Sequence, residues 1–200
     1  MLHTTALLTG FGVCAWIGYH ALVANPIVLF SWHPVCFALA YLLATPSALL
    51  AMGSRRLEST FAKREALLDW HAYMQTATVL LMSVGFGAIY YNKERNGWPH
   101  FQTNHALVGC AAVGCYLLNY VGGVLSRNKK NPKNVIHRVF GTLSFLLSGT
   151  ALCLGFYSGG WGKKNLGDEG QLIACGLVAI VHVATVAFLL SAKAPAKKTE

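Results

Sequence analysis

Four histidines stand near the starts of four successive apolar segments of this chain: His33, His71, His105 and His137. Neutral imidazole is a common ligand of haem iron, and a porphyrin leaves two axial positions for such ligands. An ionisable side chain inside a membrane segment is costly, so it usually faces a bundle interior and has a function. One such histidine could equally be structural, bonding a facing carbonyl. Four at equivalent positions favour ligation.

The segments that carry these histidines are long enough to cross a membrane. Of the 200 residues, 54% are hydrophobic and only 12% are charged, against about 25% charged in a soluble domain. Runs that reach about 20 apolar residues without strict alternation favour helices over strands. We predict an all-α integral membrane protein, a single domain over residues 1–200 whose middle four helices form a dihaem core. The six predicted spans are 4–24, 31–52, 69–91, 105–125, 137–157 and 171–192.

Helix direction sorts the four histidines into two pairs. Consecutive membrane helices run in opposite directions, so His33 and His105 begin at one face of the membrane, and His71 and His137 begin at the other. Two haem irons bound in this way would lie roughly 20 Å apart along a hydrocarbon core of about 30 Å. The pattern predicts electron transfer across a membrane.

Two glycines favour a flat macrocycle over a bare metal ion. Gly109 and Gly141 each follow one histidine of a pair by four residues, on the same helix face, and would leave room for a porphyrin. Glycine is also frequent in membrane helices, so the spacing alone is weak. A zinc or copper site would need three or four ligands in one shell, which two separate pairs do not supply.

The positive charges predict the orientation of the chain. With six spans and both termini on one side, twelve of the sixteen lysines and arginines fall on that side, which makes it cytoplasmic. The net charge of +9 lies in short loops and tails, so a nucleic-acid partner is not expected. The first segment lacks a basic start and is long for a cleaved leader, so six spans are preferred over five.

The remaining histidines and the cysteines are expected to be structural. His20 and His182 lie in the first and last spans and are interpreted as interior hydrogen-bonding residues. All six cysteines lie inside the spans as packing residues, and no C-x-x-C-H motif exists for a covalent haem.

The stretch Phe30-Ser31-Trp32-His33-Pro34-Val35, together with the other three histidines and the two His-x-x-x-Gly spacings, resembles the cytochrome b561 family. The stretch 92–105, from Asn92-Lys93-Glu94 to Thr103-Asn104-His105, is similar to its short branch, the tumour-suppressor-associated cytochrome b561 domain proteins. The resemblance covers nearly the whole chain. It implies two non-covalent haem b groups, a homodimer, and electron transfer from cytosolic ascorbate to monodehydroascorbate or a ferric iron chelate. By this resemblance His33 and His105 ligate the non-cytoplasmic haem, and His71 and His137 the cytoplasmic one.

Substrate residues are expected at both ends. A basic rim would concentrate the ascorbate anion, although the same charges serve to set topology. At the position of Asp69, two residues before a ligand, better-studied ascorbate-using members have lysine. Acceptor candidates on the outer side are Lys93, Trp98, His100 and Phe101, and His100 could equally be an ordinary loop residue. The candidates on the cytoplasmic side are Lys63, Arg64, Lys133 and Arg138.

Two other functions and an organelle complete the expectations. One alternative is a dihaem membrane anchor that exchanges electrons with quinol or a protein partner. The other is a non-redox transporter or scaffold, and the spans lack the interior acidic residues of a proton-coupled carrier. The final residues Lys197-Lys198-Thr199-Glu200 resemble a dilysine retrieval signal, which favours the endoplasmic reticulum or another endomembrane.

Overall fold

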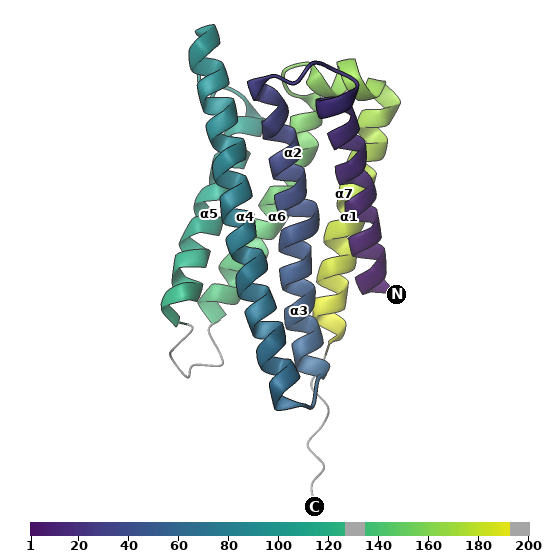
Figure 1. The fold of residues 1–200 in the computed structure, drawn as a ribbon, viewed down its shortest axis with the longest axis vertical. Helices are drawn as coiled ribbons and strands as arrows, with labels where there is room; N and C mark the ends of the chain where they lie inside the picture. Colours follow the sequence, from purple (N-terminus) through teal and green to yellow (C-terminus); the bar gives the residue numbers. More distant parts are fainter. Residues whose placement is uncertain (127–134, 193–200) are drawn as a thin grey trace, which may run out of the picture.

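The computed structural model describes residues 1–126 and 135–192, and the regular elements in this part of the chain are all helical. Two π turns, Tyr19–Val23 and Ala40–Ala44, and a short 3-10 turn, Leu29–Ser31, extend or join longer helices. Within residues 1–126 and 135–192, six helical segments are long and apolar enough to cross a membrane, because α2, the second π turn and α3 form one span. The predicted all-α six-helix bundle is confirmed. The α-helices are α1 (Leu2–Gly18), α2 (Trp32–Leu39), α3 (Thr45–Leu57), α4 (Phe61–Asn96), α5 (Asn104–Ser126), α6 (Val135–Tyr157) and α7 (Trp161–Ser191) (Figure 1).

The helices extend beyond the apolar spans expected from sequence. The 36 residues of α4 rise roughly 54 Å, well beyond a hydrocarbon core of about 30 Å. The expected loop of 53–68 therefore shortens to 58–60, where the Glu58 carboxylate accepts the backbone N–H groups of Ser59 and Thr60. These hydrogen bonds hold the pKa of Glu58 below its usual value, and the bond from the Thr60 N–H has the largest effect. At its other end α4 stops at Gly97, whose φ of 63° suits a helix C-cap.

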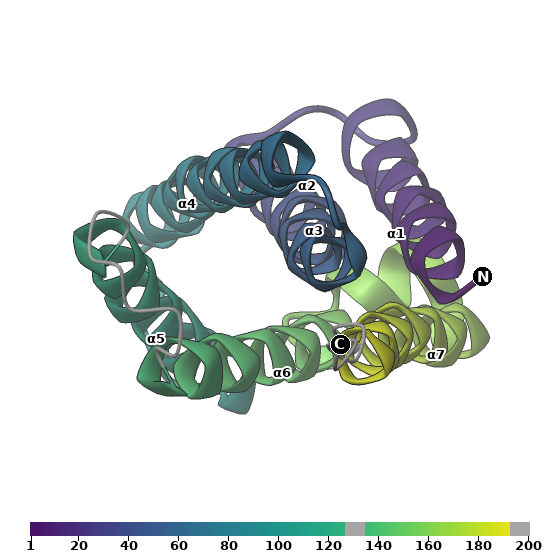
Figure 2. The same cartoon turned by 90° about the horizontal axis from the view of Figure 1, so that it is seen from below.

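Four helices surround a common axis and two lie outside them. Viewed along the bundle, α4, α3, α6 and α5 form a ring, with α1 and α7 to one side (Figure 2). Helix α4 packs on α2 and α3, α5 packs on α6, and α7 packs on α6, α1 and α3, whereas α4 and α5 touch only sparsely. The start of α1, the α3–α4 turn and the end of α7 lie at the same end of the bundle (Figure 1).

The outer surface is apolar, as lipid requires. Large side chains such as Leu8, Leu118 and Ile136 are at least 68% exposed. Soluble monomers rarely expose large apolar patches. Inside, Val13 and Ile17 of α1 pack with the residues of α2, α6 and α7 that form the main core cluster.

Pro46 shapes the second span. Proline lacks the N–H that would bond the carbonyl four residues earlier, and here that carbonyl belongs to Leu42, inside the π turn Ala40–Ala44. The α-helix resumes at Thr45, so the distortion is local. The Leu42 carbonyl instead faces Gly10 of α1, where a Cβ atom would lie only 2.1 Å from its oxygen. The bulge thus becomes a close contact between two helices.

Candidate haem-binding site

His33 and His105 meet near one end of the helix ring. His33 lies in the first turn of α2 and His105 in the first turn of α5, and their ring centroids are 5.9 Å apart. Two imidazole nitrogens on one metal ion, each at about 2.0–2.1 Å, place the ring centroids roughly 6 Å apart. The spacing therefore fits two imidazoles that would hold one haem iron.

His71 and His137 meet at the opposite end in the same way. His71 lies on α4 and His137 on α6, with ring centroids 6.4 Å apart. The two pairs predicted from helix direction are thus both brought together. Along α4, His71 is fourteen residues before Gly85, whose carbonyl contacts His33, so the pairs are roughly 21 Å apart along the axis.

Backbone carbonyls fix the tautomer of three of these imidazoles. The Nδ1 atoms of His33, His71 and His105 lie 3.1, 3.0 and 2.9 Å from the carbonyl oxygens of Gly85, Ala48 and Ala151 respectively. A carbonyl oxygen only accepts a hydrogen bond, so Nδ1 carries the hydrogen atom and is the donor. Each ring then keeps the lone pair on Nε2, the form that binds a metal while a carbonyl orients it.

Glycines make room for the histidine rings. A Cβ atom at Gly155 of α6 would lie 3.0 Å from Cε1 of His105, and one at Gly123 of α5 would lie 3.0 Å from Cε1 of His137. Gly109 lines the same cavity as His33 and His105, and a Cβ atom there would meet nothing within 4 Å, whereas Gly141 faces the Asn119 amide. The sequence spacing therefore missed the two glycines that contact the ligand rings themselves.

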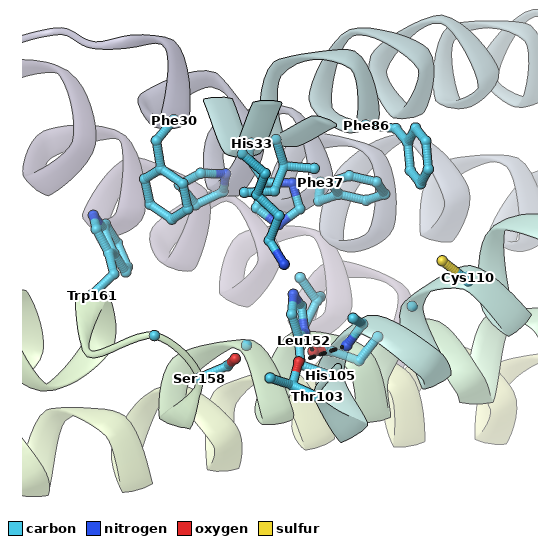
Figure 3. Close-up of a pocket in the computed structure, with 18 of the residues that line it drawn as sticks. Phe30, His33, Phe37, Phe86, Thr103, His105, Cys110, Leu152, Ser158 and Trp161 are labelled. Carbon is cyan, nitrogen blue, oxygen red and sulfur yellow. Dashed lines mark hydrogen bonds between the residues drawn. The ribbon is translucent and has the colours of Figure 1, made fainter. Parts of the chain in front are cut away.

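The first histidine pair opens into a cavity. His33 and His105 approach it from opposite walls (Figure 3), and its volume is about 320 Å³. Its walls are mainly apolar and aromatic, with Phe30, Phe37 and Trp161 among them. Such walls and a few polar groups are typical of a cofactor site.

The expected outer-side residues lie at this cavity. Lys93, Trp98, His100 and Phe101 all line it. The Lys93 ammonium donates to the carbonyl of Pro99 at 2.9 Å. The His100 ring stacks on Tyr90 with centroids 4.6 Å apart, and its Nε2 lies 2.8 Å from the Glu94 carboxylate. His100 therefore lies in the connection between α4 and α5, where two partners hold it at the cavity.

The cytoplasmic-side candidates are more scattered. Lys63 and Arg64 lie in the first turn of α4, seven to eight residues before His71, and the Arg64 guanidinium donates to the Glu58 carbonyl at 3.3 Å. Arg138 follows His137 and is exposed. Lys133 lies outside the described residues, as do the four residues of the dilysine-like tail.

The other histidine and cysteine assignments can also be compared with the structure. His182 is buried, stacks on Phe145 with centroids 4.1 Å apart, and lies 2.9 Å through Nδ1 from the Val178 carbonyl. This confirms its structural interpretation. The His20 ring makes edge contacts with the Trp16 and Tyr19 rings. Among the described residues its side chain forms no hydrogen bond, which differs from the expected hydrogen-bonding role. All six cysteines are free.

The donor sets fit haem better than a bare metal ion. Within residues 1–126 and 135–192 no group of three or more His, Cys, Asp or Glu side chains could hold a metal. Two histidines suffice where a porphyrin supplies the other four nitrogens, as in bis-histidine haems.

Comparison with known proteins agrees with this donor set. Residues 32–162, which contain all four histidines, match the family model of eukaryotic cytochrome b561. Transmembrane reductase CYB561D2 of Bos taurus is 34% identical over 148 residues, and that of Homo sapiens is 33% identical. In both cases the match covers 69% of this chain and 66% of the relative, so the chain spans just under two thirds of their length. Probable transmembrane reductase CYB561D1 of Mus musculus is 26% identical over 86% of this chain and 78% of its own length. The family match covers well over half of the sequence, and the chain belongs to the eukaryotic cytochrome b561 family.

Proposed function

We propose that this protein transfers electrons across a membrane through two non-covalent haem b groups. His33 and His105 would hold one, and His71 and His137 the other. The observation that carries the proposal is the pair of imidazole contacts, with centroids 5.9 and 6.4 Å apart at opposite ends of one helix ring. Bound haem supplies a one-electron couple between ferric and ferrous iron. The chain would supply the four ligands and orient three of them through backbone carbonyls.

The proposed donor is cytosolic ascorbate, and the proposed acceptor is monodehydroascorbate or a ferric chelate. The end that holds His71 and His137 carries Arg55, Arg56 and Lys63, which favours a cytoplasmic placement and would attract the ascorbate anion. At the other end, the cavity mouth formed by Lys93 and His100 is the candidate acceptor site. The relatives are named transmembrane reductases, which agrees with reduction at a membrane. A homodimer in an endomembrane completes the proposal.

A visible spectrum of the purified protein, with the haem-to-protein ratio, tests the proposal directly. We expect two b-type haems per chain that ascorbate reduces. Two haems that respond to dithionite but not to ascorbate would keep the haem sites and exclude the donor. The same protein reduced by a quinol would favour the membrane-anchor alternative. Absence of haem would exclude electron transfer and leave a non-redox transporter or scaffold.

Single substitutions test the pairing. We expect His33→Ala to remove one haem and His71→Ala the other, because each pair shares one iron. A spectrum of each variant should retain about half of the haem absorbance. Loss of the same haem from both variants would refute the two-pair arrangement.

A further inference from the structure

A cluster of hydroxyl and amide groups crosses the middle of the helix ring. It consists of Tyr41, Thr45, Gln75, Thr78 and Tyr116, which we call the midplane cluster. The Tyr116 hydroxyl donates to Oε1 of Gln75, and Oγ1 of Thr45 lies 3.2 Å from Oγ1 of Thr78 and 3.4 Å from the Tyr116 oxygen. Thr45 and Thr78 are at most 2% exposed. Polar groups at this depth are costly and usually functional.

The midplane cluster lies halfway between the two histidine pairs. On α4, Thr78 is seven residues from His71 and seven from Gly85, whose carbonyl contacts His33. On the second span, Tyr41 is eight residues from His33 and seven from Ala48, whose carbonyl contacts His71. Each distance is roughly 10–12 Å along the axis. The cluster therefore fills the gap between the two proposed haem sites.

Tyr41 is the unsatisfied member of the cluster. Its side chain is 2% exposed, and its hydroxyl has no hydrogen-bond partner among the described residues. It sits in the π turn Ala40–Ala44, lines the cavity that also holds His33, and has its ring centroid 6.4 Å from that of Tyr116. Buried hydroxyls almost always have a partner, and π turns often occur at functional sites.

The hydrogens of the cluster leave one acceptor on the ring next to this donor. Thr78 donates to the Met74 carbonyl at 2.9 Å, so its oxygen can accept from Thr45. The Tyr116 hydroxyl donates its hydrogen bond to Gln75, so the Tyr116 oxygen can only accept from a further partner. A water molecule placed between the tyrosines would accept from Tyr41 and donate to Tyr116. That gives it the minimum of two polar partners that buried water needs.

We propose that a water molecule bound between the hydroxyls of Tyr41 and Tyr116 completes the midplane cluster, and that this hydrogen-bonded cluster is the bridge for electrons between the two haem sites. The bridging role rests on the proposed function. In each transfer one haem is oxidised by one electron and the other is reduced by one electron, while both tyrosines keep their protons and electrons. Electronic coupling decays more slowly through covalent and hydrogen bonds than through empty space. Tyr41 is thus a positioning residue.

Two measurements on Tyr41→Phe test the two parts. Infrared spectra in ordinary and ¹⁸O-labelled water, recorded with and without haem, should show a bound-water band in the unsubstituted protein that Tyr41→Phe lacks. After photoreduction of one haem, transfer to the other should be several-fold slower in Tyr41→Phe and in Tyr116→Phe, with both midpoint potentials retained. Tyr73→Phe is the matched control, because Tyr73 is 66% exposed on the outside of α4, and it should change neither measurement.

Each outcome has one meaning. Absence of the water band from the unsubstituted protein overturns the water site. An unchanged transfer rate in Tyr41→Phe, with the band lost, overturns the bridge. A protein that binds no haem pair contradicts the proposed function, while the infrared spectrum of the haem-free protein still decides the water site.

Discussion

At the scale of single residues, two glycines leave room for the ligand rings. Gly155 backs His105 and Gly123 backs His137, and an added methyl group at either site would require the ring to move by a few tenths of an ångström. Overpacking of this kind costs about 1–3 kcal/mol. We expect Gly155→Ala to weaken haem binding at the His33–His105 pair alone, and Gly123→Ala at the His71–His137 pair alone. Haem titration followed by spectral separation of the two haems measures this.

The matched control for these substitutions is Gly114→Ala. Gly114 also lies in α5, but a Cβ atom there meets nothing within 4 Å, so both haems should be retained. Loss of both haems from Gly155→Ala would mean that the glycine supports the fold rather than one ligand.

The charge at Asp69 should affect the affinity for ascorbate. It lies two residues before His71, and its replacement by lysine changes the local charge by two units. Each unit is worth about 1 kcal/mol at 4 Å in water, or roughly fivefold in affinity. We expect Asp69→Lys to lower the ascorbate concentration that half-reduces the protein, by about fivefold or more at low salt and less at high salt. Asp168→Lys, at the opposite end of the bundle and 74% exposed, should leave this concentration unchanged.

The sequence predicts the ligands of the site better than its supports. His33, His71, His105 and His137 are visible because imidazole is out of place in apolar segments. Their carbonyl partners at Gly85, Ala48 and Ala151 have no signal of their own, since every residue carries a carbonyl. Gly155 and Gly123 are hidden among the 20 glycines of the chain. The unpartnered Tyr41 hydroxyl also depends on packing between helices that no local pattern encodes.

At the scale of helices, the contact between Gly10 and Leu42 joins α1 to the second span. A Cβ atom at Gly10 would overlap backbone, 2.1 Å from the Leu42 oxygen, and backbone cannot step aside as a side chain can. We expect Gly10→Ala to force α1 away and lower the thermal unfolding temperature in detergent. Gly12→Ala, whose Cβ meets nothing within 4 Å, should leave that temperature unchanged or raise it, because alanine favours helix by about 0.5–1 kcal/mol. Equal effects of the two substitutions would contradict the contact.

Helix number follows from the sequence, whereas helix ends do not. Apolar length identifies the six spans because lipid demands it. The polar residues that flank a span can continue the helix into water, as they do at both ends of α4. The stop at Gly97 depends on a left-handed backbone that glycine permits but does not announce.

At the scale of the whole molecule, the two ends of the bundle should face different compartments. The α3–α4 turn at 58–60 and the α4–α5 connection at 97–103 lie at opposite ends (Figure 1). In sealed vesicles of known orientation, we expect Ser59→Cys to react with an impermeant maleimide from the cytoplasmic side only, and Asn96→Cys from the other side only. The native cysteines lie within the helices and provide the background. Labelling of both positions from one side would refute the six-span orientation.

The carbonyl bonds of His33 and His71 have a consequence for assembly. His33 of α2 bonds α4 at Gly85, and His71 of α4 bonds back to α3 at Ala48. These two hydrogen bonds therefore join the second and third spans near both ends. A shift of one span along the other by one helical turn would break both bonds at once. Both bonds use Nδ1 and need no iron. We expect this register to form during membrane insertion. Haem would then bind afterwards, between helices whose relative positions are already fixed.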